Sequence, residues 1–188
     1  RLFRRQRQMC IRDRLDGVCG IKIFMGASTG NLLSATDEEV EAVVANGNRV
    51  IAVHAEDEFL MNENKKTILK DSNDVGMHCK WRDVNSSLNA TKRVVSLAKK
   101  HNRHVHVLHI TTAEEMDYLR NHKDTATVEV LPNHLTFHAP DCYEQLGTLA
   151  QQNPPIREKH HQDALWQAIN DGTVCLLYTS PSPRDRIR

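Results

Sequence analysis

The chain has 188 residues, of which 26% are charged, and its formal net charge is +1. This length suits one domain with a sizeable core, and so small a charge gives no electrostatic basis for a nucleic-acid partner. No apolar run approaches the length that spans a bilayer. Cys19, Cys79 and Cys142 are widely spaced and form no C-x-x-C pair, which predicts a protein of the reducing cytoplasm rather than a disulfide scaffold.

The two ends of the chain share an unusual relationship at the level of DNA. One short duplex can encode residues 9–14 on one strand and, in another frame, residues 175–180 on the complementary strand. Residues 5–8 and 181–185 extend the match to what looks like translated sequencing-adapter DNA. We therefore interpret residues 1–14 and 175–188 as non-native and residues 15–174 as the domain. A basic arm that binds nucleic acid or membrane is the alternative, and unrelated codons in the underlying gene would restore it.

The first predicted element is a strand over residues 21–25, apolar and bounded by glycines, with Lys22 inside it. An ammonium ion is costly to bury, so a lysine in such a run requires an explanation. Its stem could reach solvent at a strand end. Alternatively, Lys22 could be part of an active site at the carboxyl ends of the strands of a parallel barrel, where such sites are found.

Strands and helices then alternate along the chain. Thr36 and Glu39 predict a capping box that opens a helix ending near Gly47, and Thr112 and Glu115 predict a second one opening a helix through Arg120. The remaining elements follow from apolar periodicity. They are strands over 49–54, 104–109 and 125–131, helices over 59–70, 87–100 and 158–169, a loop over 71–84, and a further strand that begins at Thr173.

This alternation predicts an α/β fold of parallel βαβ units. A complete (β/α)8 (TIM) barrel takes about 250 residues, so we expect a partial barrel that holds roughly strands 4–7 with their helices.

Histidines mark the ends of two predicted strands. His54 and His109 each occupy the last strand position before polar residues, which is where a barrel places its chemistry. A single histidine there is more often structural than a ligand, but two of them after the strand of Lys22 indicate a metal site. By strict alternation His104 and His106 fall on the opposite face from His109, so we interpret them as packing or surface residues.

Four segments together resemble the dihydroorotases of the amidohydrolase superfamily. Residues 20–33 resemble the strand of their carboxylated lysine, and residues 53–58 and 107–112 resemble the next two metal-binding strands. Residues 153–157 resemble the loop whose asparagine contacts the pyrimidine ring. The motifs are short, but they occur in the right order and spacing across nearly all of residues 15–174.

The resemblance implies a cytoplasmic hydrolase of cyclic amides that acts on a small molecule, with no nucleic-acid or membrane partner, and is possibly a homo-oligomer. Two Zn²⁺ ions would be bridged by Lys22 as its carbamate and bound by His54 and His109, and would activate a water molecule. Glu56 would orient His54, and Asn153 would bind dihydroorotate or its product, N-carbamoyl-L-aspartate.

Other parts of such a site lie outside this sequence. The resemblance implies a His-x-His motif before residue 15 and a general acid/base aspartate after Val174, so we expect no catalytic residue within the chain and no activity from it alone. Two alternatives stay open, namely a hydantoinase, dihydropyrimidinase or allantoinase, and a non-catalytic homologue that serves as a scaffold.

Overall fold

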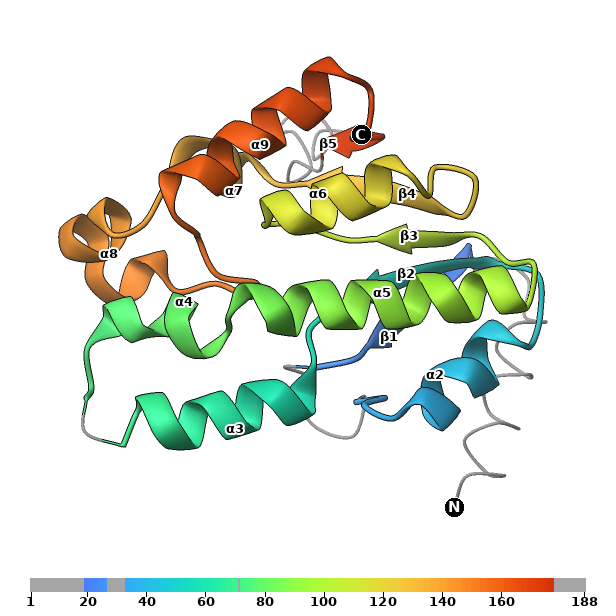
Figure 1. Cartoon of the computed structure of the whole chain (residues 1–188), viewed down its shortest axis with the longest axis horizontal. Coiled ribbons are helices and arrows are strands. Elements are labelled where there is room, and N and C mark those ends of the chain that lie inside the picture. Colours follow the sequence, from blue (N-terminus) through green and yellow to red (C-terminus); the bar gives the residue numbers. More distant parts are fainter. Residues whose placement is uncertain (1–18, 27–32, 71, 178–188) are drawn as a thin grey trace, which may run out of the picture.

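The computed structural model describes residues 19–26, 33–70 and 72–177, and shows one sheet of parallel strands that neighbour each other in chain order (Figure 1). Each strand pairs in parallel with the next. The strands are β1 (Gly20–Phe24), β2 (Val50–His54), β3 (Val105–Val107), β4 (Ala126–Val130) and β5 (Leu176–Leu177). This sequential parallel order confirms the prediction of α/β units from part of a barrel.

The strand register divides the side chains of the sheet between two faces. Lys22 lies beside Ala52, Ala52 beside His106, and His106 beside Thr127. Residues aligned in this way point to the same side, so these four form one row on one face. The residues between them point to the other face and are at most 2% exposed: Ile23, Ile51, Val53, Val105, Val107 and Val128.

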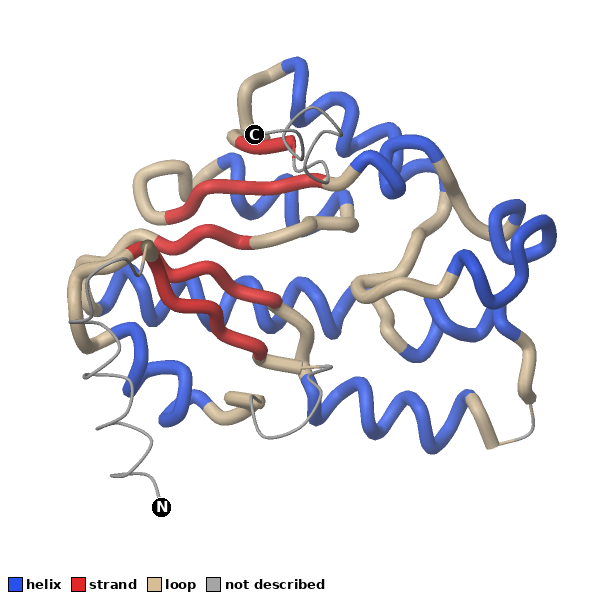
Figure 2. The backbone as a smooth tube through the Cα atoms, turned by 180° about the vertical axis from the view of Figure 1, so that it is seen from behind, coloured by secondary structure: helices blue, strands red, loops and turns tan. Residues whose placement is uncertain are grey.

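Helices cover the face that carries these apolar residues. Valines of α2 and α5, together with apolar residues of α6 and α9, pack against the strands in the main core. Figure 2 shows the sheet from behind, with its strands in front of these helices. The covering helices are α2 (Asp37–Val44), α5 (Val84–Lys100), α6 (Ala113–Arg120) and α9 (Lys159–Asn170). The row of Lys22 and His106 therefore lies on a face that no described helix covers.

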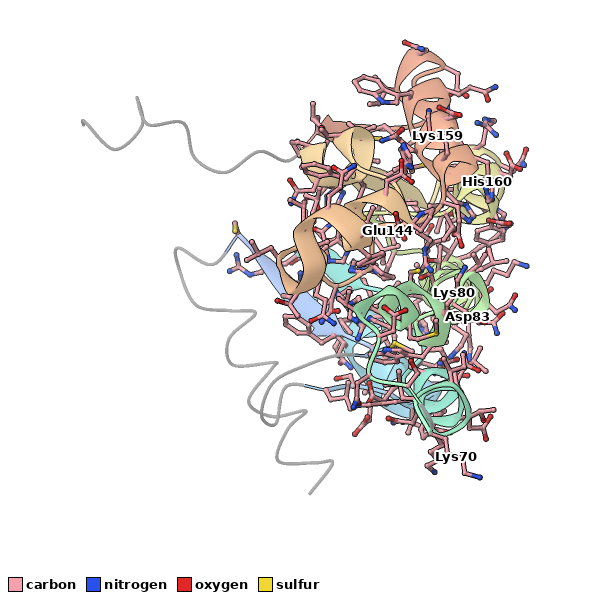
Figure 3. All side chains as sticks on the ribbon, turned by 90° about the vertical axis from the view of Figure 1, so that its left-hand side faces the viewer. Lys70, Lys80, Asp83, Glu144, Lys159 and His160 are labelled. Atoms are coloured by element: carbon pink, nitrogen blue, oxygen red, sulfur yellow. The ribbon has the colours of Figure 1, made fainter. Side chains whose placement is uncertain are left out.

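A second group of elements lies beyond the carboxyl ends of the strands, at the left in Figure 1 and facing the viewer in Figure 3. A small cluster of buried residues holds part of it together, including Cys79, Cys142 and Ile156. These elements are α3 (Glu58–Ile68), η1 (Val75–Met77), α4 (His78–Trp81), α7 (Pro132–Thr136), α8 (Asp141–Leu146) and η2 (Gly147–Ala150).

Three sequence-based expectations need correction. Residues 71–84 are predicted as a loop, yet they contain η1 and α4, because a four-residue helix is too short to show apolar periodicity. The helix predicted from Ser87 begins at Val84, where the Asp83 carboxylate accepts the Ser86 amide. The last strand is predicted to begin at Thr173 but begins at Leu176, since the Asp171 carboxylate holds the amide and hydroxyl of Thr173 in a turn.

The interpretation of the two ends as non-native stays a prediction. Residues 1–14 and 178–188 lie outside the described residues, and the pairing of Leu176 and Leu177 with β4 says nothing of their origin. Within the described part of the chain, no helix is both long and apolar enough to cross a bilayer.

Candidate active site

Lys22 lies on the uncovered face of the sheet, in the middle of β1 and not at its end. The sequence predicts a buried lysine, but its side chain is exposed because the row that it shares with Ala52 and His106 faces away from the helices. Its Nζ lies 4.9 Å from the centroid of the Phe24 ring. Partial desolvation lowers the pKa of Lys22, and the negative charge of Glu129 opposes this shift.

His54 ends β2 and is held by a buried carboxylate. Its Nε2 lies 2.7 Å from Glu56 Oε2, and Glu56 also binds Arg82, whose Nε donates to Oε1 over 3.1 Å while its Nη2 contacts Oε2. Burial by itself raises the pKa of Glu56, but the hydrogen bond from His54 and the charge of Arg82 outweigh it and hold that pKa at about 2. An ionised Glu56 only accepts hydrogen bonds, so it fixes the proton of a neutral His54 on Nε2 and leaves the Nδ1 lone pair free.

That lone pair points toward His109. The His54 Nδ1 atom lies 3.0 Å from His109 Nε2, and the two rings meet edge to face with centroids 4.8 Å apart. Burial is the main cause that lowers the pKa of His109 well below its usual value, and the charge of Lys22 acts in the same direction. His109 is therefore a neutral imidazole near pH 7, which is the form that binds metal.

The spacing of these two histidines can be compared with that of two ligands on one metal ion. Two nitrogen ligands of a tetrahedral Zn²⁺ ion are about 3.3 Å apart for bond lengths near 2.05 Å. The observed 3.0 Å between His54 Nδ1 and His109 Nε2 is close to that separation. The other ring nitrogen of His109, Nδ1, is buried and has no hydrogen-bond partner in the described part of the chain that would orient the ring. Among the described residues, however, no group of three or more His, Cys, Asp or Glu side chains is placed to hold an ion. The pair thus fits one side of a metal centre that requires further ligands.

The sequence-based assignment of faces around β3 is wrong. Strict alternation places His109 with Val105 and Val107, but the backbone of His109 is left-handed, with φ of 41°, and the strand ends at Val107. The side chain consequently faces His54. His106, assigned to packing or surface, lies in the row of Lys22, where its Nδ1 is 2.8 Å from Thr127 Oγ1.

Glu129 of β4 belongs to this site although the sequence analysis does not select it. Its Oε1 accepts the amide of His109 over 3.1 Å, and its Oε2 is 3.6 Å from His106 Nε2. The residue is 4% exposed. A glutamate inside an otherwise apolar strand was the signal that could have identified it, by the same reasoning that singled out Lys22.

Asn153 lies on a separate exposed loop beyond the strand ends. His78 of α4 binds this loop, with its Nε2 2.9 Å from the Gln152 carbonyl oxygen. Further along the same segment, the buried Arg157 donates to the carbonyl oxygen of Arg82 over 2.7 Å. The structure thus brings His54, His109 and Glu56 into contact, and gives neither Lys22 nor Asn153 a described hydrogen bond to any of them.

Known proteins show related sequences and the same fold. No family model matches the chain. A dihydroorotase of Methanosarcina acetivorans is 31% identical over an alignment of 173 residues, and the match covers 86% of this chain and 37% of that protein. An allantoinase of Streptomyces avermitilis is 30% identical over 89% of this chain and 38% of its own length. The solved dihydropyrimidinase of Brevibacillus agri superposes with a TM-score of 0.82 at 20% identity, covering 97% of this chain and 42% of that one.

The chain therefore spans about two fifths of the length of its relatives. It contains the strands of Lys22 and His54 and the turn of His109 that follows β3. Enzymes named for different cyclic amides match it over nearly the same extent. On these similarities and on its sequential parallel sheet, the chain belongs to the cyclic amidohydrolases of the amidohydrolase superfamily.

Proposed function

We propose that the full-length protein is a metal-dependent dihydroorotase. It adds water to the cyclic amide of dihydroorotate and gives N-carbamoyl-L-aspartate, and biosynthesis of pyrimidines uses the reverse direction. The observation that carries this proposal is the close pair of ring nitrogens, His54 Nδ1 and His109 Nε2, at the carboxyl ends of neighbouring strands. The similarity to the Methanosarcina dihydroorotase supports the choice of substrate.

In this proposal the chain's own residues would hold two Zn²⁺ ions. His54 would bind through Nδ1 while Glu56 keeps its proton on Nε2, and His109 would bind through Nε2. As the free amine, Lys22 would add carbon dioxide through Nζ and release a second proton from that nitrogen, and the resulting anionic carbamate would supply oxygen ligands to the two ions. When bound, such ions lower the pKa of a water molecule and polarise the amide carbonyl. The uncovered face of the sheet gives Lys22 the access to carbon dioxide that this reaction requires.

Asn153 is the proposed substrate contact. Its loop is exposed, and the hydrogen bond of His78 to Gln152 fixes the residue next to it. A general acid/base aspartate beyond Val174 and a His-x-His motif before residue 15 would complete the site. We place the enzyme in the cytoplasm, with a small molecule and no nucleic acid or membrane as its partner.

The second candidate is a hydantoinase, dihydropyrimidinase or allantoinase. The similarity to the Streptomyces allantoinase, at 30% identity over 89% of this chain, favours it almost as strongly. Turnover of dihydroorotate, hydantoin, dihydrouracil and allantoin by the full-length protein distinguishes these activities, and a preference for any of the last three contradicts the dihydroorotase. Metal analysis of the same preparation tests the scaffold alternative, which requires none.

The role of Lys22 has a direct test in the full-length protein. We expect Lys22→Ala to abolish activity and short carboxylic acids to restore part of it, because they supply the missing bridging carboxylate. Lys80→Ala is the matched control, since Lys80 is an exposed lysine whose ion pair, in the described part of the chain, is with Glu158. Full activity of Lys22→Ala without any added acid contradicts the carbamate.

An assay of the 188-residue chain by itself tests whether part of the active site lies outside it. We expect it to show no ring opening by itself, because the proposed aspartate and His-x-His ligands lie outside it. Turnover by this chain, freed of other protein, contradicts the proposal. We also propose that residues 1–14 and 175–188 derive from adapter DNA, and the nucleotide sequence of the gene tests this.

A further inference from the structure

The backbone at His109 is in a conformation that its sequence does not favour. A φ of 41° is left-handed, and only a few per cent of residues other than glycine adopt it. Such a conformation persists where surrounding contacts determine it. Here it decides the function of the side chain, because an extended His109 would point toward the helices together with Val105 and Val107.

Three consecutive amides around this residue are bound. The Leu108 amide donates to the Val53 carbonyl over 3.1 Å, and the Ile110 amide donates to the Glu129 carbonyl over 2.8 Å. The central amide, that of His109, donates to the Glu129 carboxylate over 3.1 Å. Glu129 thus holds two adjacent amides, one with its main chain and one with its side chain, and the side-chain bond acts at the left-handed residue itself.

The carboxylate of Glu129 is 4% exposed, and Lys22 interacts with its charge without forming an ion pair with it. Within the described residues it forms no ion pair with an arginine or lysine, and its second oxygen is 3.6 Å from His106 Nε2. Burying a carboxylate is costly, so an apolar side chain would suit a core strand better. A hydrogen bond to a charged acceptor is about twice as strong as one between neutral groups. The carboxylate can therefore hold the His109 amide more firmly than a neutral side chain would.

We propose that Glu129 is a positioning residue. It holds the left-handed turn at His109 and thereby directs His109 Nε2 toward His54 Nδ1, so that both nitrogens can bind one metal ion. The inference rests on the proposed function, in which these two nitrogens bind the same metal ion. It assigns Glu129 no contact with substrate. It requires only an acceptor at the position of Oε1, whatever the charge of the group that carries it.

The test is Co²⁺ binding to the metal-free full-length protein, followed by visible absorption, which reports the geometry of the ligands. We expect Glu129→Ala to weaken Co²⁺ binding about 10- to 100-fold and to alter the spectrum. Glu129→Met, which keeps the volume and loses the acceptor, should do the same if the alanine variant does not fold. Glu129→Gln keeps an oxygen acceptor and should bind within about threefold of the wild type, since a neutral hydrogen bond retains about half the strength. Glu144→Ala, at an exposed glutamate of α8 (Figure 3), should change nothing.

The outcomes separate the two proposals. If the wild-type protein binds no Co²⁺, the proposed function fails, and so does the role of Glu129 that depends on it. If the wild type binds Co²⁺ and the alanine and methionine variants bind it equally well with the same spectrum, only the role of Glu129 is overturned. A lowered melting temperature together with an unchanged spectrum has the same meaning, because it shows a purely structural role.

Discussion

At the scale of single residues, Glu56 shows how one buried carboxylate serves two neighbours. It is fully buried, and it would be unstable there as an anion without the guanidinium of Arg82 on one side and His54 on the other. Arg82 is itself 3% exposed and lies over the Trp81 ring at 4.9 Å. The charge that orients His54 therefore depends on an arginine from the segment before α5.

Removing that arginine tests the dependence. We expect Arg82→Ala to lower the free energy of unfolding by about 3–5 kcal/mol, because it leaves a buried carboxylate without its cation. Lys80→Ala, which breaks the exposed pair with Glu158, should cost less than about 1 kcal/mol. Urea titrations of the full-length protein measure both, and equal losses would contradict a special role for the buried pair.

The lowered pKa of His161 predicts how the free energy of unfolding depends on pH. Burial and the charge of His160 lower its pKa to about 4, although Glu114 and Glu158 oppose this, and its Nδ1 accepts the Ala113 amide over 3.0 Å. Because the unfolded chain binds the proton at a higher pH, near 6.5, the stabilisation from neutral His161 is complete above about pH 6.5. It is lost as the pH falls from there toward 4.

The matched variant is His161→Gln, whose side-chain oxygen can still accept the Ala113 amide. Between pH 6 and 5 the wild type should lose up to about 1.4 kcal/mol per pH unit more than this variant, which is the limit for one titrating group. Unfolding free energies from urea titrations at these two pH values give the difference. Parallel pH profiles would show that His161 is protonated equally in both states.

At the scale of elements, the two predicted capping boxes have different outcomes. At α2 the box is complete, since the Thr36 hydroxyl accepts the Glu39 amide and the Glu39 carboxylate accepts the Thr36 amide. At α6 the Thr112 hydroxyl accepts the Glu115 amide, but the Glu115 carboxylate instead accepts the hydroxyls of Thr112 and Thr91. Tertiary contact with α5 therefore redirects half of the second box.

The complete box predicts a local loss of stability. We expect Thr36→Ala to destabilise the protein by about 1 kcal/mol, the usual cost of losing a helix N-cap. Thr67→Ala is the control, because the exposed Thr67 hydroxyl donates to the Glu63 carbonyl one turn earlier in the same helix, so its removal should cost less than about 0.5 kcal/mol. Hydrogen exchange of the α2 amides would localise the effect, and unchanged exchange there would contradict it.

At the scale of the whole molecule, Arg157 connects segments that are far apart in sequence. Its buried guanidinium donates to Thr111 Oγ1 after β3, to the carbonyl oxygens of Arg82 and Asp83, and to Ser87 Oγ in α5. The loop that carries Asn153 is thus tied to both the strand ends and the start of α5. Burial lowers the pKa of this arginine, and the negative charges of Glu115 and Glu56 oppose that shift.

We expect Arg157→Met to cost about 3 kcal/mol or more, because it leaves buried carbonyl oxygens without a donor while keeping most of the volume. It should also raise KM in the full-length enzyme, since the Asn153 loop loses its anchor. Arg120→Met is the control, as Arg120 pairs at the surface with Asp117 and Asp171. An unchanged KM in Arg157→Met would contradict a role of the Asn153 loop in substrate binding.

The sequence by itself determined the order of parallel strands and covering helices and the positions of Lys22, His54 and His109 on successive strands. Those features are encoded locally, in apolar periodicity, in caps such as Thr36 and in polar residues at strand ends. It could not determine that Lys22 is exposed, because exposure depends on which face the helices cover. Alternation along the chain also failed at His109, where one left-handed residue reverses the face.

Only the tertiary structure decided that Glu129 binds the His109 amide, that Arg82 supports Glu56 and that Arg157 holds the Asn153 loop. Each of these contacts joins residues at least 20 positions apart. Such contacts depend on how distant segments are placed relative to one another, which the apolar periodicity within any one segment does not specify.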